Sequence, residues 1–160
     1  MRSLVRSAVG VATIVAAAAS CTPEQAVAPA VTIEETNFAS SLGIDLSKMT
    51  KTPSGMYYQD TQVGTGTAVQ SGFHVTLHYT LYLANGITVE TSIGKTPLQF
   101  TVGATPKQVI AGFDEGMLGL RVGGTRRMII PPDLGYGAAQ QNDIPPNSIL
   151  IFVVSLVSVP

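Results

Sequence analysis

The chain has little cysteine, no tryptophan and little charge for its length. Of its 160 residues one is cysteine, none is tryptophan and 12% are charged, with 9 basic against 10 acidic side chains. A single cysteine excludes an internal disulfide, so the fold must depend on its hydrophobic core. The near balance of charge, and the shortness of the basic pair Arg126-Arg127, argue against a nucleic-acid partner.

The sequence also lacks the clusters of side chains that mark most catalytic and metal sites. His74 and His78 fall on one face of an expected strand, but no further histidine or cysteine accompanies them. We therefore expect neither a metal nor another cofactor. Asp114 and Glu115 are adjacent and indicate a solvated helix face. No Ser-His-Asp or Cys-His arrangement stands out.

The first 20 residues have the layout of a secretory signal. Arg2 and Arg6 give a basic start, and residues 8–19 form an uncharged, mostly apolar run that is too short to span a membrane. The sequence Ala18-Ala19-Ser20-Cys21 further indicates a bacterial lipoprotein cleavage site, with Cys21 lipidated and the exported protein anchored to a membrane of the cell envelope. Ordinary cleavage after an Ala-x-Ala site is the alternative, and it would leave Cys21 as a free thiol.

Residues 21–50 are predicted to be a flexible tether, and residues 51–160 a single domain. The tether begins with Thr-Pro-Glu-Gln and Ala-Pro-Ala and has few large apolar residues. Its apolar residues would either form a turn or two of helix or dock on the edge of the domain; they are Phe38, Leu42, Ile44 and Leu46. Because no long helical dimerisation arm is evident, we expect a monomer.

The domain is predicted to be rich in β-structure. Apolar and polar residues alternate over residues 73–83, which predicts a strand, and Asn85-Gly86 predicts a hairpin turn after it. Further strands are expected at residues 56–62, 87–91, 98–102, 126–130 and 149–157. The last of these is apolar on both faces, as expected of a buried central strand.

One short helix is expected between Thr105 and Leu118, and local signals disagree about its start. The sequence Thr105-Pro106-Lys107-Gln108 has the form of a capping box with proline at the first helical position, which predicts a start at Pro106. Gly112 and Gly116, however, make so long a helix intrinsically weak.

Several sequence blocks follow one another in a fixed order along the domain. They are Val75-Thr76-Leu77-His78-Tyr79-Thr80, Gly112-Phe113-Asp114-Glu115-Gly116, Gly123-Gly124-Thr125-Arg126-Arg127, Leu134-Gly135-Tyr136-Gly137 and Ile144-Pro145-Pro146. With this order and spacing, the chain from about Gly55 to Val159 resembles the FKBP family of peptidyl-prolyl cis-trans isomerases. The resemblance implies an α+β, FKBP-like fold: a strongly twisted antiparallel sheet wrapped around one short helix. It places that helix at about residues 111–118 rather than from Pro106.

The resemblance also implies the site residues. Tyr79, Glu90 and Tyr136 match the polar positions of the family pocket, and Tyr136 would donate a hydrogen bond to the substrate carbonyl. The apolar substrate-binding positions are matched by Val89, Leu98, Val109, Ile110, Phe113, Ile144 and Phe152. Without the family, four of these apolar residues would be interpreted as core, the two tyrosines as structural and Glu90 as a solvated acid. The four are Val109, Ile110, Phe113 and Phe152.

Some of these positions depart from the family pattern. Phe113 replaces the usual tryptophan, and Glu90 replaces the usual aspartate. Val89 and Leu98 stand where phenylalanine is common. The segment 137–143 is also shorter than in a typical member. These departures concern the depth of the pocket and its substrate range rather than the fold.

The sequence therefore predicts an exported peptidyl-prolyl cis-trans isomerase that acts on proline-containing polypeptides and takes macrolide ligands. Isomerisation requires an apolar pocket more than acids, bases or metals, because it twists an amide without breaking a bond. The alternative is an FKBP-like binding or chaperone module with weak or no turnover, which Val89, Leu98 and Glu90 favour. An unrelated small β-rich binding domain is a third hypothesis, and it requires the order of the blocks to be accidental.

Overall fold

The computed structural model describes residues 31–159, so the predicted signal segment and Cys21 lie outside the described residues. In residues 31–159 no helix combines the length and the apolar character that crossing a membrane requires. The 3-10 helices are η1 (Ser40–Leu42), η2 (Leu46–Lys48) and η3 (Pro132–Leu134), and the α-helix is α1 (Ala111–Met117). The strands are β1 (Thr50–Lys51), β2 (Tyr57–Gln62), β3 (His74–Leu83), β4 (Thr88–Thr91), β5 (Leu98–Thr101), β6 (Thr125–Ile130) and β7 (Leu150–Ser158).

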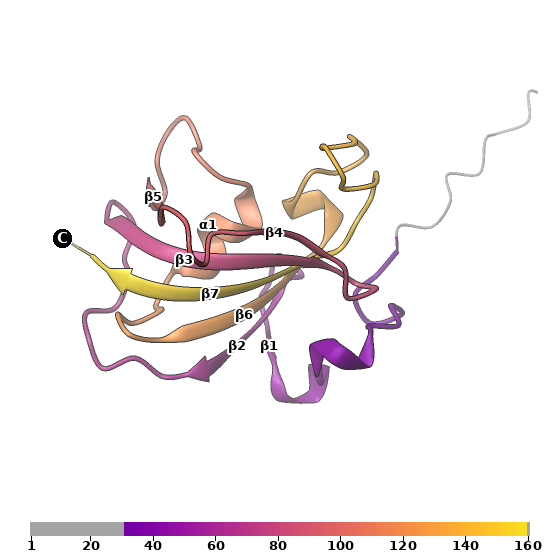
Figure 1. The fold of residues 1–160 in the computed structure, drawn as a ribbon, viewed down its shortest axis with the longest axis horizontal. Coiled ribbons are helices and arrows are strands. Elements are labelled where there is room, and N and C mark those ends of the chain that lie inside the picture. Colours follow the sequence, from indigo (N-terminus) through magenta and orange to yellow (C-terminus); the bar gives the residue numbers. More distant parts are fainter. Residues whose placement is uncertain (1–30, 160) are drawn as a thin grey trace, which may run out of the picture.

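The strands form one antiparallel sheet in the order β1-β2-β6-β7-β3-β4, and β5 also pairs with β3. Figure 1 shows β7 running between β6 and β3 in the middle of the sheet. Its residues Leu150 and Ile151 are fully buried, as the apolar run on both faces predicts. The predicted α+β fold, with one antiparallel sheet and one short helix, is confirmed.

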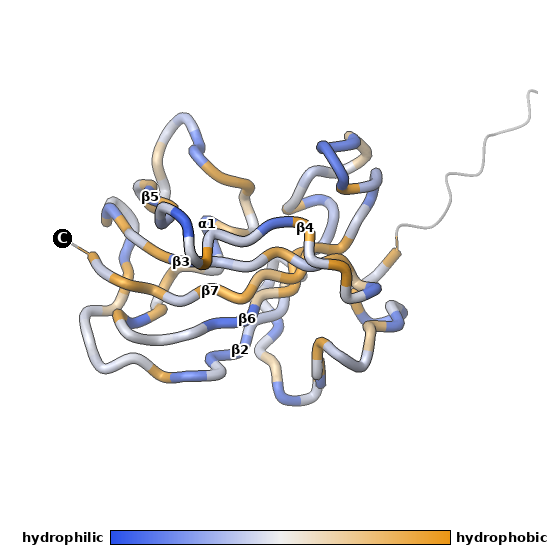
Figure 2. The backbone as a smooth tube through the Cα atoms, viewed as in Figure 1, coloured by the Kyte–Doolittle hydropathy of each residue, from blue (hydrophilic) through white to orange (hydrophobic). Residues whose placement is uncertain are grey.

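The sheet carries a hydrophobic cluster on each face, because successive strand residues point to opposite sides. Met128 and Phe152 pack into the larger cluster, which includes the α1 residues Phe113 and Met117. Ile129 and Ile151, one position along, belong to the cluster on the other face. Figure 2 shows the resulting hydrophobic stretch along β7 at the centre of the molecule.

Residues 31–50, which the sequence predicts to be part of a tether, pack on the face of the sheet away from α1. Ile33 and Leu42 are buried there with Ile129 and Ile151. The segment is fixed at its start by Glu34, whose carboxylate accepts hydrogen bonds from the Lys51 ammonium and the Tyr57 hydroxyl at 2.5 and 2.7 Å. The segment therefore combines both arrangements expected for its apolar residues. It forms short 3-10 turns, and it docks on the domain.

Helix α1 begins at Ala111, as the family resemblance predicts, and the local prediction of a start at Pro106 is wrong. The side chain of Gln108 does not cap a helix but accepts a hydrogen bond from the Thr101 N–H at the end of β5. The two helix glycines are explained by packing, because α1 lies very close to β6. A Cβ on Gly112 would overlap Ile130, and one on Gly116 would overlap Met128.

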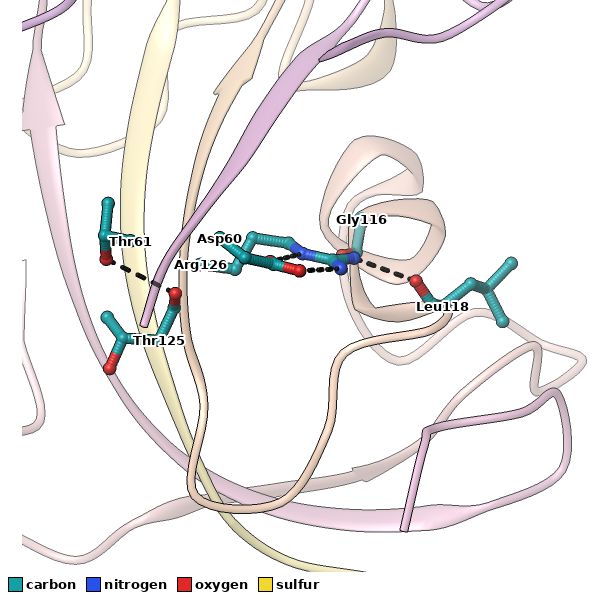
Figure 3. Close-up of polar contacts among 6 residues, drawn as sticks. All are labelled: Asp60, Thr61, Gly116, Leu118, Thr125 and Arg126. Atoms are coloured by element: carbon teal, nitrogen blue, oxygen red, sulfur yellow. Dashed lines mark hydrogen bonds and ion pairs between the residues drawn. The ribbon is translucent and has the colours of Figure 1, made fainter. Parts of the chain in front are cut away.

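A buried arginine joins the end of α1 to two strands. Figure 3 shows the Arg126 guanidinium between Asp60 on β2 and the helix end. Its Nε and Nη2 donate to the Asp60 carboxylate at 2.6 and 3.0 Å, and its Nη1 donates to the carbonyls of Gly116 and Leu118, both at 2.8 Å. Arg127, the next residue, points to the other face and donates to the Gly43 carbonyl. The two arginines therefore form no common basic patch.

Candidate active site

A cavity of about 180 Å³ opens between α1 and the face of the sheet that it covers. Several elements meet at this cavity: β3, β4, β5 and β7, the loop before α1, α1 itself and the segment after η3. Its lining residues are Tyr79, Leu81, Glu90, Leu98, Gln108, Val109, Ile110, Phe113, Tyr136 and Phe152. The lining is thus mainly aromatic and aliphatic, with a few polar groups.

Phe113 is the centre of an aromatic group at the floor of the cavity. Its ring centroid lies 4.9 Å from that of Phe152, 5.8 Å from that of Phe100 and 6.1 Å from that of Tyr79. The first and last of these contacts are edge-to-face, a geometry that aromatic pairs prefer. Because Phe113 is only 2% exposed and its neighbours lie on three strands, the floor is closely packed.

Two tyrosines, the Glu90 carboxylate and the Gln108 amide supply the polar side chains of the cavity. Burial, followed by hydrogen bonding to Glu90 and the negative charge of that carboxylate, raises the pKa of Tyr79 to about 12. Burial and then the charge of Glu90 raise the pKa of Tyr136 as well. Both hydroxyls are therefore protonated at neutral pH and can donate hydrogen bonds, that of Tyr79 to Glu90.

The backbone before α1 supplies a further donor. Ile110 is the N-cap residue, and its carbonyl accepts hydrogen bonds from the N–H groups of Phe113 and Asp114. Within residues 31–159 the N–H of Ile110 itself has no hydrogen-bond partner. A free backbone donor beside an apolar cavity is suited to holding a carbonyl oxygen of a bound peptide.

The cavity brings together most of the residues that the sequence predicts for the site, but not Val89 or Ile144. Val89 is half-buried against the large cluster and lies beside Glu90 without reaching the lining. Ile144 is 4% exposed and belongs to the larger cluster, and its backbone forms a bridge with Gln141. Both residues therefore pack with the larger hydrophobic cluster rather than line the cavity.

Sequence reasoning missed two lining residues, Leu81 and Gln108. Leu81 could have been predicted, because the alternation along β3 places it on the same face as Tyr79. Gln108 carried no comparable signal. Its position depends on the hydrogen bond to Thr101, which belongs to a strand on the far side of an irregular loop.

The described residues contain no group of three or more His, Cys, Asp or Glu side chains that could hold a metal ion. His74 Nδ1 lies 3.2 Å from the Thr101 hydroxyl, and His78 Nδ1 lies 3.0 Å from the Ser92 carbonyl. Each histidine thus has its own hydrogen-bond partner on a neighbouring segment. The chemistry available in the cavity is apolar contact together with hydrogen bonding.

This fold is found in known proteins. Residues 65–157 match a family described as FKBP-type peptidyl-prolyl cis-trans isomerase. The crystal structure of FkpA from Escherichia coli superimposes with a TM-score of 0.64 at 32% identity, over 75% of this chain and 55% of FkpA.

Two relatives are similar to this chain over very different shares of their own length. An FK506-binding protein of Neisseria meningitidis serogroup B is 41% identical over 107 residues, which are 66% of this chain and 96% of the relative. FK506-binding protein 4 of Dictyostelium discoideum is 43% identical over 113 residues, 70% of this chain but only 30% of that longer protein. On the family match and this likeness, the chain belongs to the FKBP-type peptidyl-prolyl cis-trans isomerase family.

Proposed function

We propose that this protein accelerates cis-trans isomerisation of X-Pro bonds in exported or surface polypeptides, and that it does so in the cavity above Phe113. The observation that supports this proposal most strongly is the aromatic floor, where Phe113, Phe152 and Tyr79 pack against one another at the base of a cavity of about 180 Å³. The hydroxyl of Tyr136 and the N–H of Ile110 are the donors for the peptide carbonyls.

The proposed mechanism depends on the electronic character of the peptide bond. Rotation faces a barrier of about 18–20 kcal/mol, because twisting destroys amide resonance. Uncatalysed prolyl isomerisation takes on the order of 10–100 s, so reaching about a millisecond needs roughly 10⁵-fold acceleration, or about 7 kcal/mol. The twisted amide is less dipolar than the planar one. A dry apolar pocket therefore favours the transition state over the ground state.

Each group of the cavity has a role in this mechanism. The floor rings exclude water and contact the proline ring. The Tyr136 hydroxyl and the Ile110 N–H hold carbonyl oxygens, so that rotation is confined to the bond before proline. Tyr79 packs against the floor rings, and burial together with the neighbouring Glu90 carboxylate raises its pKa. No step requires a proton to be transferred in full.

The test is exchange spectroscopy on a peptide that contains Ala-Leu-Pro-Phe, with and without the protein. We expect exchange between cis and trans signals to accelerate in proportion to protein concentration. Leu98→Arg should abolish this acceleration, because the side chain would enter the cavity, whereas Gln99→Arg adds the same charge to the other side of β5. If both variants retain wild-type activity while folded, the cavity is not the site.

The same measurement separates catalysis from binding alone. Leu98 lines the cavity with an aliphatic side chain where phenylalanine is common in the family. This departure is one that favours a binding or chaperone module with weak turnover. Such a module would perturb the peptide signals, and those of a macrolide ligand, without accelerating exchange. The similarity of this chain to relatives named FK506-binding proteins supports the proposal that the cavity binds macrolides.

We further propose that the protein is exported from a bacterial cell and anchored to an envelope membrane through lipidated Cys21. The support is the basic start, the short apolar run and the position of the only cysteine at the end of the signal. In detergent partitioning, the wild-type protein should enter the detergent phase and Cys21→Ser should remain in the aqueous phase. Equal partitioning of the two forms would contradict the anchor.

A further inference from the structure

The loop that carries Val109 and Ile110 extends away from the sheet. Figure 1 shows it as an arch between β5 and α1. Its residues have no regular secondary structure, so local backbone hydrogen bonding does little to fix their conformation. The contacts that join this loop to neighbouring elements therefore determine where the two pocket residues lie.

Two sets of polar contacts hold the loop. Near its start, the Asp114 carboxylate accepts hydrogen bonds from the Gly103 N–H at 2.7 Å and from the Lys107 ammonium at 3.0 Å, which fastens the loop to α1. Near its end, Gln108 Oε1 accepts a hydrogen bond from the Thr101 N–H at 2.8 Å, which fastens the loop to β5. The second contact lies directly before Val109.

The contact between Gln108 and Thr101 completes the edge of the sheet. Val102, the residue after Thr101, donates its N–H to the Phe73 carbonyl beside β3. Since successive N–H groups of a strand point to opposite sides, the N–H of Thr101 points away from β3. No strand pairs with β5 on that side in the described sheet. The side-chain oxygen of Gln108 thus takes the place that a neighbouring strand's carbonyl would occupy.

The two segments that this contact joins both carry residues that line the cavity. Strand β5 carries Leu98, and the loop carries Val109 and Ile110, all of which line the cavity beside Gln108. We propose that Gln108 is a positioning residue, which holds the Leu98 wall and the Val109–Ile110 wall at a fixed separation before a proline peptide binds. This inference rests on the proposed isomerase function of the same cavity.

Such preorganisation has a specific kinetic signature. When only a fraction of molecules hold the competent geometry, apparent affinity falls by that fraction, while the bound complex reacts as before. Loss of the Gln108 contact should therefore raise KM for a proline peptide and leave kcat nearly unchanged. The strength of one ordinary hydrogen bond corresponds to an increase of about 2- to 12-fold.

The test compares Gln108→Met, which removes the acceptor at similar side-chain length, with Gln108→Glu, which keeps an acceptor oxygen. Gln99→Met makes the same chemical change on β5, outside the cavity lining. We expect the increase in KM only in Gln108→Met. We also expect hydrogen exchange of the Thr101 amide to accelerate by a similar factor in that variant. Gln108→Glu should restore both values, and thermal unfolding would verify that all three variants are folded.

Three outcomes would overturn the proposal. The first is a Gln108→Met variant with unchanged KM and unchanged exchange at Thr101, and the second is an equal rise in KM for Gln99→Met. The third is a raised KM with the Thr101 amide still protected, which would mean that Gln108 acts by touching the peptide. If the wild-type protein lacks isomerase activity, the proposed function fails, but peptide affinity by NMR titration and exchange at Thr101 still decide the role of Gln108.

Discussion

At the scale of single residues, we expect the hydroxyl of Tyr136 to make a limited and measurable contribution to the proposed isomerase activity. It lies at the cavity with a raised pKa and is protonated at neutral pH. Tyr136→Phe removes one hydrogen bond of about 0.5–1.5 kcal/mol to the substrate carbonyl, so we expect kcat/KM to fall about 2- to 12-fold. Tyr82→Phe is the matched control, because Tyr82 packs against the cluster on the opposite face of the sheet. An equal loss in both variants would contradict the assignment.

The raised pKa of Tyr79 predicts how stability depends on pH. The unfolded chain releases the Tyr79 proton near pH 10, whereas the folded protein keeps it until about pH 12. The stability that neutral Tyr79 contributes is therefore complete below about pH 10 and is lost as the pH rises toward about 12. Urea unfolding across this range should show a falling free energy of unfolding and a shallower fall in Tyr79→Phe. Equal slopes would show that Tyr79 ionises as easily in the folded state.

At the scale of secondary-structure elements, close packing of α1 on β6 makes an ordinarily helpful substitution harmful. Helix propensity predicts that Gly116→Ala stabilises the protein by about 1 kcal/mol. The new methyl group would overlap the sulfur of Met128, and overpacking costs about 1–3 kcal/mol. We therefore expect net destabilisation in urea unfolding, and a smaller cost when Met128→Val has made room. A Gly116→Ala variant more stable than wild type would contradict this account.

The same elements show what the sequence could and could not predict. Alternation predicted β3, and the run that is apolar on both faces predicted β7 as a central strand, because burial alone determines these patterns. The start of α1 could not be decided locally, since Gln108 bonds to Thr101 across the loop instead of capping the helix. For the site, the order of sequence blocks identified Phe113 and Tyr136. No residue pattern distinguishes a lining position from a core position such as Ile144.

At the scale of the whole molecule, the packing of residues 31–50 predicts a cost for shortening the chain. A fragment of residues 51–160 is expected to fold, because the larger cluster lies entirely within it. It loses the burial of Ile33 and Leu42, and each buried aliphatic side chain contributes about 1.5–3 kcal/mol. We expect the free energy of unfolding to be about 3–6 kcal/mol lower than for residues 31–160.

Urea unfolding of the two fragments provides this comparison, with Val31→Ala in the longer fragment as a control at an exposed position. Equal midpoints for the two fragments would mean that the docked segment adds nothing to stability. A shorter fragment that fails to fold at all would place residues 31–50 within the cooperative unit, and the boundary at residue 51 would then be wrong.

The position of Phe113 at the floor of the cavity has an optical consequence. The chain contains no tryptophan, so its intrinsic emission comes mainly from tyrosine. A tryptophan introduced by Phe113→Trp would be the single indole in the protein, in contact with the ring of Tyr79 and at the base of the cavity. Its emission would move to shorter wavelength as a ligand displaces water. The protein would then report the occupancy of its own pocket, and unlabelled proline peptides and macrolides could be titrated by fluorescence.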